Sequence, residues 1–129
     1  MLMQKDFDRW NEKKKITNAD DTRKLCHDRE IWWAAFGVNI GREQDGRGDN
    51  FERPIVVYSV LSSDTFLAVP LSTKKRMDKF QSLIVHEAVS GYALLDQIKV
   101  LDKKRLLRKI GMVKQEEFDI LRKKLKDLL

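Results

Sequence analysis

The chain has 129 residues, 42% of them hydrophobic, and carries a formal net charge of +6. This length fits one compact domain with room for an appendage, and the hydrophobic content excludes wholesale disorder. The single cysteine, Cys26, excludes an intrachain disulfide and fits a reducing compartment. The longest clearly apolar run, residues 31–36, is far too short to cross a membrane, and the first residues lack the apolar stretch of a signal peptide. We therefore expect a cytoplasmic protein with no membrane partner.

Residues 1–28 are polar and highly charged, and we interpret them as an N-terminal extension ahead of the main domain. Met3, Phe7 and Trp10 follow a helical spacing of four and then three, which predicts a short amphipathic helix. Polar residues 17–21 then indicate a break in that helix. The extension either packs on the main domain or serves as an arm.

The pattern changes at Glu30 to short apolar runs that are typical of strands. Five strands are predicted, at residues 31–36, 54–61, 65–71, 80–86 and 92–101. Residues 37–50, with four glycines, predict a long flexible loop. Loops of this length in small domains are often functional.

A helical pattern replaces the strands after Asp102. Asp102 can cap a short helix over residues 103–110, which Gly111 would end. A second helix is predicted from an apolar stripe with spacings of three, four and three: Phe118, Leu121, Leu125 and Leu128. Five short strands with terminal helices predict a small α+β barrel.

The positive charge is concentrated in the last part of the chain. Residues 99–129 contain eleven Lys or Arg and five Asp or Glu, so this segment carries the whole net charge of +6. A localised basic surface indicates a polyanion such as nucleic acid. The other interpretation is a solvated helical face, which charge alone slightly favours.

Several short motifs stand in the order and spacing of one protein family: Glu30-Ile31-Trp32-Trp33, Gly41-Arg42-Glu43-Gln44-Asp45-Gly46, Arg53-Pro54-Ile55-Val56-Val57, Val69-Pro70-Leu71-Ser72, Leu95-Asp96-Gln97-Ile98, Leu101-Asp102-Lys103-Lys104-Arg105-Leu106 and Lys109-Ile110-Gly111. On these motifs residues 29–129 resemble the PemK/MazF toxins of type II toxin–antitoxin systems. The resemblance implies an SH3-like β-barrel of about five antiparallel strands with C-terminal helices, to which residues 1–28 add a helical extension. It also implies a homodimer.

The resemblance further implies a sequence-selective endoribonuclease, an mRNA interferase, that cuts single-stranded RNA. In this family the 2′-OH of the substrate attacks, no metal or other cofactor is needed, and a cognate antitoxin protein neutralises the enzyme. The expected partners are therefore single-stranded mRNA, the antitoxin and a second copy of the chain.

Arg53 and Ser72 are the expected catalytic residues. Arg53 matches the catalytic arginine of the family's Arg-Pro motif, and its guanidinium suits a phosphate. Pro54 disfavours helical geometry at Arg53 and so fixes the arginine at the start of a strand. Ser72 stands where the family has threonine and keeps a hydroxyl donor, although a serine that ends a strand has an equally simple structural explanation. Thr73 should face the opposite way if that strand continues.

The RNA-binding residues expected from the same resemblance are Glu43, Gln44, Thr73, Lys74 and Gln97. Three aromatic residues, Trp32, Trp33 and Phe36, could stack on bases, but aromatic residues in an apolar strand more often belong to a core, and we assign them to the core. His27 and His86 lie outside the family motifs, and with one cysteine they form no convincing zinc site. We interpret Cys26 as a small residue in a polar linker.

Two alternatives to the nuclease remain at this point. The first is a catalytically weak or inactive relative that binds RNA or an antitoxin, which the serine at position 72 and the basic tail favour. The second is an interaction module whose tail contacts a protein partner.

Overall fold

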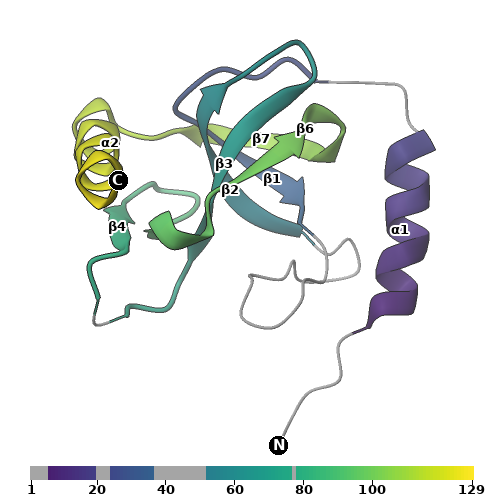
Figure 1. Cartoon of the computed structure of the whole chain (residues 1–129), viewed down its shortest axis with the longest axis horizontal. Helices are drawn as coiled ribbons and strands as arrows, with labels where there is room; N and C mark the ends of the chain where they lie inside the picture. Colours follow the sequence, from purple (N-terminus) through teal and green to yellow (C-terminus); the bar gives the residue numbers. More distant parts are fainter. Residues whose placement is uncertain (1–5, 20–23, 37–51, 77) are drawn as a thin grey trace, which may run out of the picture.

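The computed structural model describes residues 6–19, 24–36, 52–76 and 78–129, which form an antiparallel sheet with a helix on each side (Figure 1). In chain order the elements are α1 (Phe7–Ala19), β1 (Glu30–Ala35), β2 (Glu52–Val60), β3 (Thr65–Ser72), β4 (Gln81–Ile84), β5 (Gly91–Leu94), the 3-10 turn η1 (Leu95–Gln97), β6 (Lys99–Asp102), the 3-10 turn η2 (Lys103–Arg105), β7 (Leu106–Met112) and α2 (Gln115–Leu128). This is the predicted α+β class. None of the helices described here is both long and apolar enough to cross a membrane.

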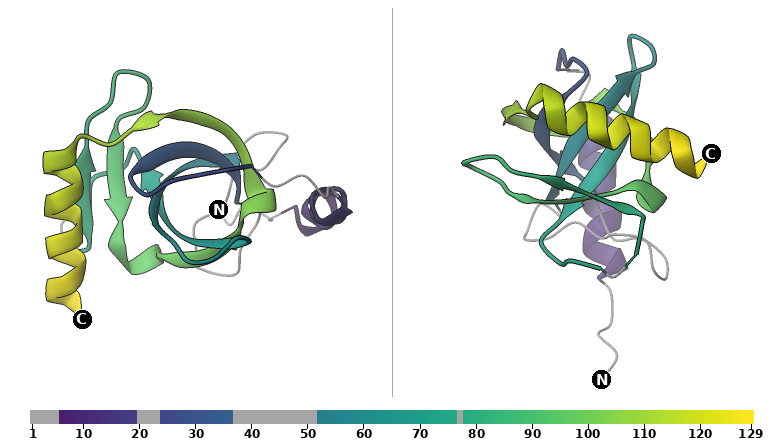
Figure 2. Two further views of the ribbon diagram at one scale, coloured as in Figure 1. Left: turned by 90° about the horizontal axis from the view of Figure 1, so that it is seen from above. Right: turned by 90° about the vertical axis from the view of Figure 1, so that its left-hand side faces the viewer.

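The sheet is organised around β3. Its strand order is β4-β5-β3-β2-β1-β7, and β6 pairs with β3 beside β5. The first half of β3 pairs with β6 and its last two residues pair with β5, so one long strand serves two partners. Seen from above, the strands curl into a barrel that is not fully closed (Figure 2).

The alternation of side chains along β1 separates an inner face from an outer face. Trp32 and Ala34 point inward, into a core that also holds Phe36 and Phe66. The outward set is Ile31, Trp33 and Ala35, and these three meet different neighbours. Ile31 lies in the core under α2, Ala35 packs against Trp10 of α1, and the half-buried Trp33 lies between them.

Helix α2 covers one side of the barrel with its predicted apolar stripe. Phe118, Leu121 and Leu125 are 4%, 0% and 8% exposed, and Leu128 is partly buried against the same core. Burial of each such side chain stabilises the fold by about 1.5–3 kcal/mol. The prediction of this helix is confirmed.

Two of the predicted elements differ in the structure. Residues 92–101 form two strands, because the turn η1 interrupts them, and the predicted helix at residues 103–110 is wrong. There, Asp102 caps only the 3-10 turn η2, accepting the N–H of Lys104 at 2.8 Å. The chain then continues as β7, because the exposed edge of β1 supplies backbone partners from Glu30 to Ala34. The sheet consequently has seven strands instead of five.

The segment before β1 contains both a helix and part of the core. Trp10 is buried to 7% exposure, whereas Phe7 of the same predicted stripe is 48% exposed and Met3 lies outside the described residues. The helix also extends to Ala19, past the start of the predicted break. Cys26 is a core residue at 3% exposure and not a linker residue. Asp28 accepts the N–H of Val60, so residues after 23 are tied to the barrel.

Glu30 is a buried carboxylate at the start of β1, with 4% exposure. Its Oε1 accepts the indole N–H of Trp32 at 2.9 Å and the backbone N–H of His27 at 2.8 Å. Its Oε2 lies 2.9 Å from Nζ of Lys109 on β7. Burial acts to raise the pKa of Glu30, but the hydrogen bonds from Lys109, Trp32 and His27 outweigh it and hold the pKa below its usual value. This network joins the segment before β1, β1 itself and β7.

Candidate active site

A hollow of about 550 Å³ lies beside the start of β2 and the end of β3. Its described lining residues are Trp33, Glu52, Arg53, Pro54, Leu71, Thr73, Ala88, Val89 and Ser90. They come from β1, β2, β3 and the segment between β4 and β5. The hollow therefore forms where four separate parts of the chain meet.

Arg53 is a buried cation within this lining, at 7% exposure. Strand β2 places it directly across from Ala34 of β1. Its Nη1 donates a hydrogen bond of 2.9 Å to the backbone carbonyl of Leu71 on β3. A guanidinium anchored to backbone is held in one orientation, so its positive charge has a fixed position.

The two hydroxyl residues at the end of β3 behave differently. Ser72 is the last residue of the strand, and its Oγ accepts the N–H of Lys74 at 3.2 Å. Ser72 does not line the hollow, but Thr73 does. The alternation that would turn Thr73 away applies only while the strand continues, and here the strand ends one residue earlier.

The backbone at Ser72 is closely packed against β5. A Cβ on Gly91 would lie 2.8 Å from the carbonyl oxygen of Ser72, a separation that side chains do not tolerate. Tyr92 pairs with Ser72 in the ladder. Glycine at position 91 thus allows β5 to approach and fix the end of β3.

Two lining residues of the hollow, Trp33 and Glu52, are held by Arg108 of β7, a contact that the sequence did not reveal. The guanidinium of Arg108 lies 5.1 Å from the ring centre of Trp33, and it donates to both carboxylate oxygens of Glu52, at 3.0 and 3.3 Å.

Assignment of Trp32 and Phe36 to the core is confirmed by exposures of 6% and 2%. For Trp33 the assignment is wrong, because the outward alternation of β1 leaves its ring on the hollow.

Two of the other expected RNA contacts, Lys74 and Gln97, do not line this hollow. Lys74 is exposed, and its carbonyl accepts a 2.8 Å hydrogen bond from Gln81, whose Oε1 accepts the N–H of Arg76. Gln97 is half-buried in η1 and does not line the hollow. Glu43 and Gln44 lie outside the described residues, as does the predicted loop of residues 37–50. The buried Gln81 thus supports the segment that carries Thr73 and Lys74, a role that its sequence position gave no reason to expect.

Other titratable groups are placed away from the hollow or held in local contacts. His27 lies 3.4 Å from the carboxylate of Glu30, and Nδ1 of His86 accepts the N–H of Ala88. Burial raises the pKa of the Cys26 thiol, although Lys103 acts to lower it. The raised pKa disfavours the nucleophilic thiolate. No group of three His, Cys, Asp or Glu side chains within the described ranges is arranged to hold a metal ion.

The fold is that of the MazF proteins. MazF from Deinococcus radiodurans superposes with a TM-score of 0.69 at 22% identity, covering 81% of this chain and 96% of that chain. The MazE–MazF structure from the same organism gives 0.64 at 20% identity, with 81% and 95% covered. A mycobacterial endoribonuclease in complex with its cognate antitoxin gives 0.61 at 17% identity, with 80% and 93% covered. No curated protein sequence matches the chain.

The sequence itself identifies the family. Residues 27–129 match the family of PemK-like, MazF-like toxins of type II toxin–antitoxin systems. The match covers most of the chain, so this protein belongs to that toxin family. It includes every described residue of the hollow.

Proposed function

We propose that the protein is a metal-independent, sequence-selective endoribonuclease toxin that cuts single-stranded RNA in the cytoplasm and is neutralised by a cognate antitoxin. The observation that carries the proposal is a buried, backbone-anchored guanidinium, Arg53, in the lining of a hollow that a hydroxyl and an aromatic ring also line. Family membership and the endoribonucleases among the similar structures support the same activity.

The chemistry that this hollow suits is attack on phosphorus by the substrate's own 2′-OH. The 2′-oxygen loses its proton and bonds to phosphorus, the bond to the 5′-oxygen breaks, and that oxygen takes up a proton. The products are a 2′,3′-cyclic phosphate and a 5′-OH end. The dianionic phosphorane between them needs fixed positive charge and hydrogen-bond donors, which Arg53 supplies without reorganisation.

The family motif and the geometry of the hollow indicate different residues as the hydroxyl that assists Arg53. Ser72 occupies the family's motif position, whereas Thr73 lines the hollow. We assign Arg53 as the principal catalytic residue and one of these two hydroxyls as the second donor to the phosphoryl oxygens. We also propose four contacts to other nucleotides of the RNA: the exposed Lys74, the half-buried Gln97, Glu43 and Gln44. Trp33 adds a ring on which a base can stack.

Incubation of the purified protein with a long single-stranded RNA in excess EDTA tests this function. Discrete cuts with 5′-OH and cyclic phosphate ends are the expected result, because the nucleophile belongs to the substrate. Binding without any cut would favour the inactive RNA- or antitoxin-binding relative, which the serine at position 72 also favours. Absence of both binding and cleavage would contradict both functions.

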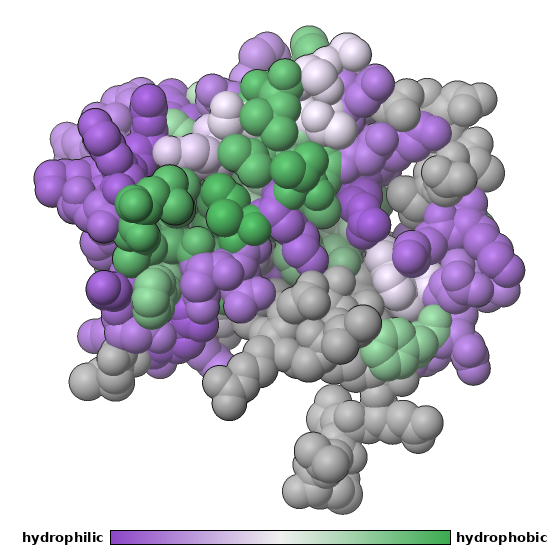
Figure 3. All heavy atoms as spheres, viewed as in Figure 1, coloured by the Kyte–Doolittle hydropathy of each residue, from purple (hydrophilic) through white to green (hydrophobic). Residues whose placement is uncertain are grey.

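We further propose that the chain acts as a homodimer, through the apolar face over β6. Figure 3 shows apolar residues gathered on this face of the molecule. Leu67 of β3 pairs with Val100 of β6, and since their neighbours Phe66 and Leu101 point into the core, these two point outward. Val100 is 56% exposed, and such a patch is usually covered by a partner.

A Val100→Glu substitution tests this interface. A charge inside a dimer contact is costly to bury, so we expect the variant to be a monomer at concentrations where the unmodified protein is a dimer. Light scattering coupled to size-exclusion chromatography measures the mass. A Leu83→Glu variant, in which the exposed residue lies on β4, is the control and should leave the dimer intact. A variant at position 100 with an unchanged dimer mass would place the interface elsewhere.

A further inference from the structure

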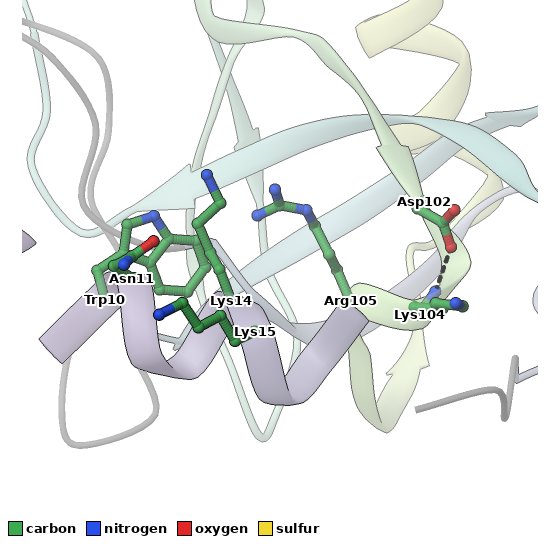
Figure 4. Close-up of a pocket in the computed structure, with 7 residues that line it drawn as sticks. All are labelled: Trp10, Asn11, Lys14, Lys15, Asp102, Lys104 and Arg105. Atoms are coloured by element: carbon green, nitrogen blue, oxygen red, sulfur yellow. Dashed lines mark hydrogen bonds between the residues drawn. The ribbon is translucent and has the colours of Figure 1, made fainter. Parts of the chain in front are cut away.

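A second, strongly basic pocket lies between α1 and the turn η2, away from the hollow of Arg53 (Figure 4). Its volume is about 360 Å³, and four basic side chains and one acidic side chain line it. Those that matter here are Trp10, Lys14 and Lys15 of α1, and Asp102, Lys104 and Arg105 of the β6–η2 segment.

The pocket exists because one aromatic residue docks α1 on the barrel. Trp10 packs against Ala35 and Leu107, and it is the buried residue among the described side chains of α1. The guanidinium of Arg105 lies 5.6 Å from the Trp10 ring centre, and its Nη1 donates to the carbonyl of Ala35 at 3.1 Å. These contacts hold Arg105 in place, while Lys14 and Lys15 of α1 stay exposed.

Basic side chains outnumber acidic ones among the described residues that line this pocket. Lys14 and Arg105 both line the pocket, and in Figure 4 Asp102 is drawn at the other end of it, where it accepts the N–H of Lys104. Burial lowers the pKa of Arg105, against the opposing effect of Asp102, so its charge is partly desolvated. Lys15 lies 3.6 Å from Glu12, but both side chains are mostly exposed and such a pair is weak. An anion entering the pocket would therefore be attracted by several cations at once.

The position of the pocket relates it to the active site. Ala35, which accepts from Arg105, is two residues along β1 from Trp33, and strand geometry separates these positions by about 7 Å. Arg105 ends the turn η2 and directly precedes β7, the strand that carries Arg108 over Trp33. The pocket and the hollow are thus neighbours along β1, and the paired Arg108 and Glu52 belong to the same stretch of the sheet.

We propose that this pocket binds a backbone phosphate of single-stranded RNA and so extends the substrate path beyond the hollow of Arg53. The inference rests on the proposed function, that the chain binds RNA. An acidic peptide is the less suitable occupant, because peptide binding relies on buried apolar anchors and the Trp10 ring already serves to dock α1. Phosphate contacts position a strand without reading its sequence, which fits a site made of lysine and arginine.

The test compares two triple variants of the full chain. Lys14→Gln/Lys15→Gln/Lys104→Gln removes charge from the pocket but leaves the docking residues Trp10 and Arg105. The control is Arg122→Gln/Lys123→Gln/Lys126→Gln, which removes the same charge from exposed positions on α2. Affinity for a fluorescent single-stranded RNA is measured at several salt concentrations, together with the cleavage rate at saturating RNA.

We expect the pocket variant to bind RNA on the order of tenfold more weakly, and its salt slope to fall by about 0.7 for each phosphate that the protein no longer neutralises. The control should keep its slope, and the cleavage rate at saturating RNA should be unchanged in both variants. A pocket variant that binds RNA like the unmodified protein would overturn the proposal. So would a selective loss of binding to a polyglutamate peptide, which would assign the pocket to an acidic protein segment. An unmodified protein that does not bind RNA would instead refute the proposed function, and the inference would fall with it.

Discussion

Replacement of Arg53 by alanine should lower the RNA cleavage rate by about 10³-fold, with much less effect on RNA affinity. Removal of one fixed donor to a developing oxyanion typically costs about 10²–10³ in kcat, and Arg53 presents more than one donor. Arg53→Lys keeps the charge but loses the planar fork, so we expect it to recover only part of the rate. Single-turnover cleavage of a short RNA separates this effect from product release.

Stability has to be measured beside activity, because Arg53 is buried and bonded to the Leu71 carbonyl. Loss of that hydrogen bond should cost about 1 kcal/mol, which a folded domain tolerates. A thermal melt of each variant checks this. Arg122→Ala, an exposed arginine of α2, is the matched control and should cleave at the unmodified rate. Rapid cleavage by folded Arg53→Ala would refute the assignment of this residue.

The sequence predicts those parts of the fold that local pattern determines. The apolar stripe of α2 and the core strands β1, β2 and β3 follow from the spacing and clustering of their own residues. The segment after Asp102 does not, because a cap and a later Gly111 favour a helix locally. The pairing of Glu30 with Met112 decides the outcome, and the two residues are far apart in sequence. A strand that completes the edge of β1 overrides the local preference.

The residues of the candidate site likewise include some that local sequence predicts and some that depend on contacts between distant parts of the chain. Arg53 was found because it stands in a family motif before a proline, and the structure places it in the hollow. Glu52 and Arg108 were missed because nothing local joins residues 56 positions apart. The position of Thr73 depends on where the ladder with β5 stops, which is at Ser72. A period of two residues predicts the direction of a side chain only within a strand of known length.

The buried carboxylate Glu30 joins several of these elements. The groups that bind it come from the segment before β1, from β1 and from β7, the strand that also carries Arg108, the partner of Glu52 in the hollow. Any loosening of β7 therefore disturbs both the barrel edge and the wall beside Trp33. Stability and the geometry of the site are coupled through this strand.

Replacement of Glu30 by alanine should lower the free energy of unfolding by about 2–3 kcal/mol at neutral pH, because it leaves a buried indole N–H and a backbone N–H without their acceptor. Urea denaturation measures the difference, and Glu116→Ala on the exposed face of α2 should change it by less than about 0.5 kcal/mol. In the folded state the pKa of Glu30 lies below its usual value of 4.5. Its contribution to stability is therefore complete above pH 4.5 and is lost as the pH falls toward the folded-state pKa.

The difference in free energy of unfolding between the unmodified protein and Glu30→Ala should consequently become smaller in acid. At neutral pH the free energy of unfolding of Glu30→Gln should lie between the two. The glutamine keeps an acceptor for Trp32 but loses the charge that attracts Lys109, which is itself about half exposed. If the difference in free energy of unfolding between the unmodified protein and Glu30→Ala stays constant from neutral pH to about pH 3, the Glu30 side chain stabilises the fold through its shape and not through its charge. In that case the link between β1 and β7 would depend on packing, and the hollow should survive the loss of Lys109 as well.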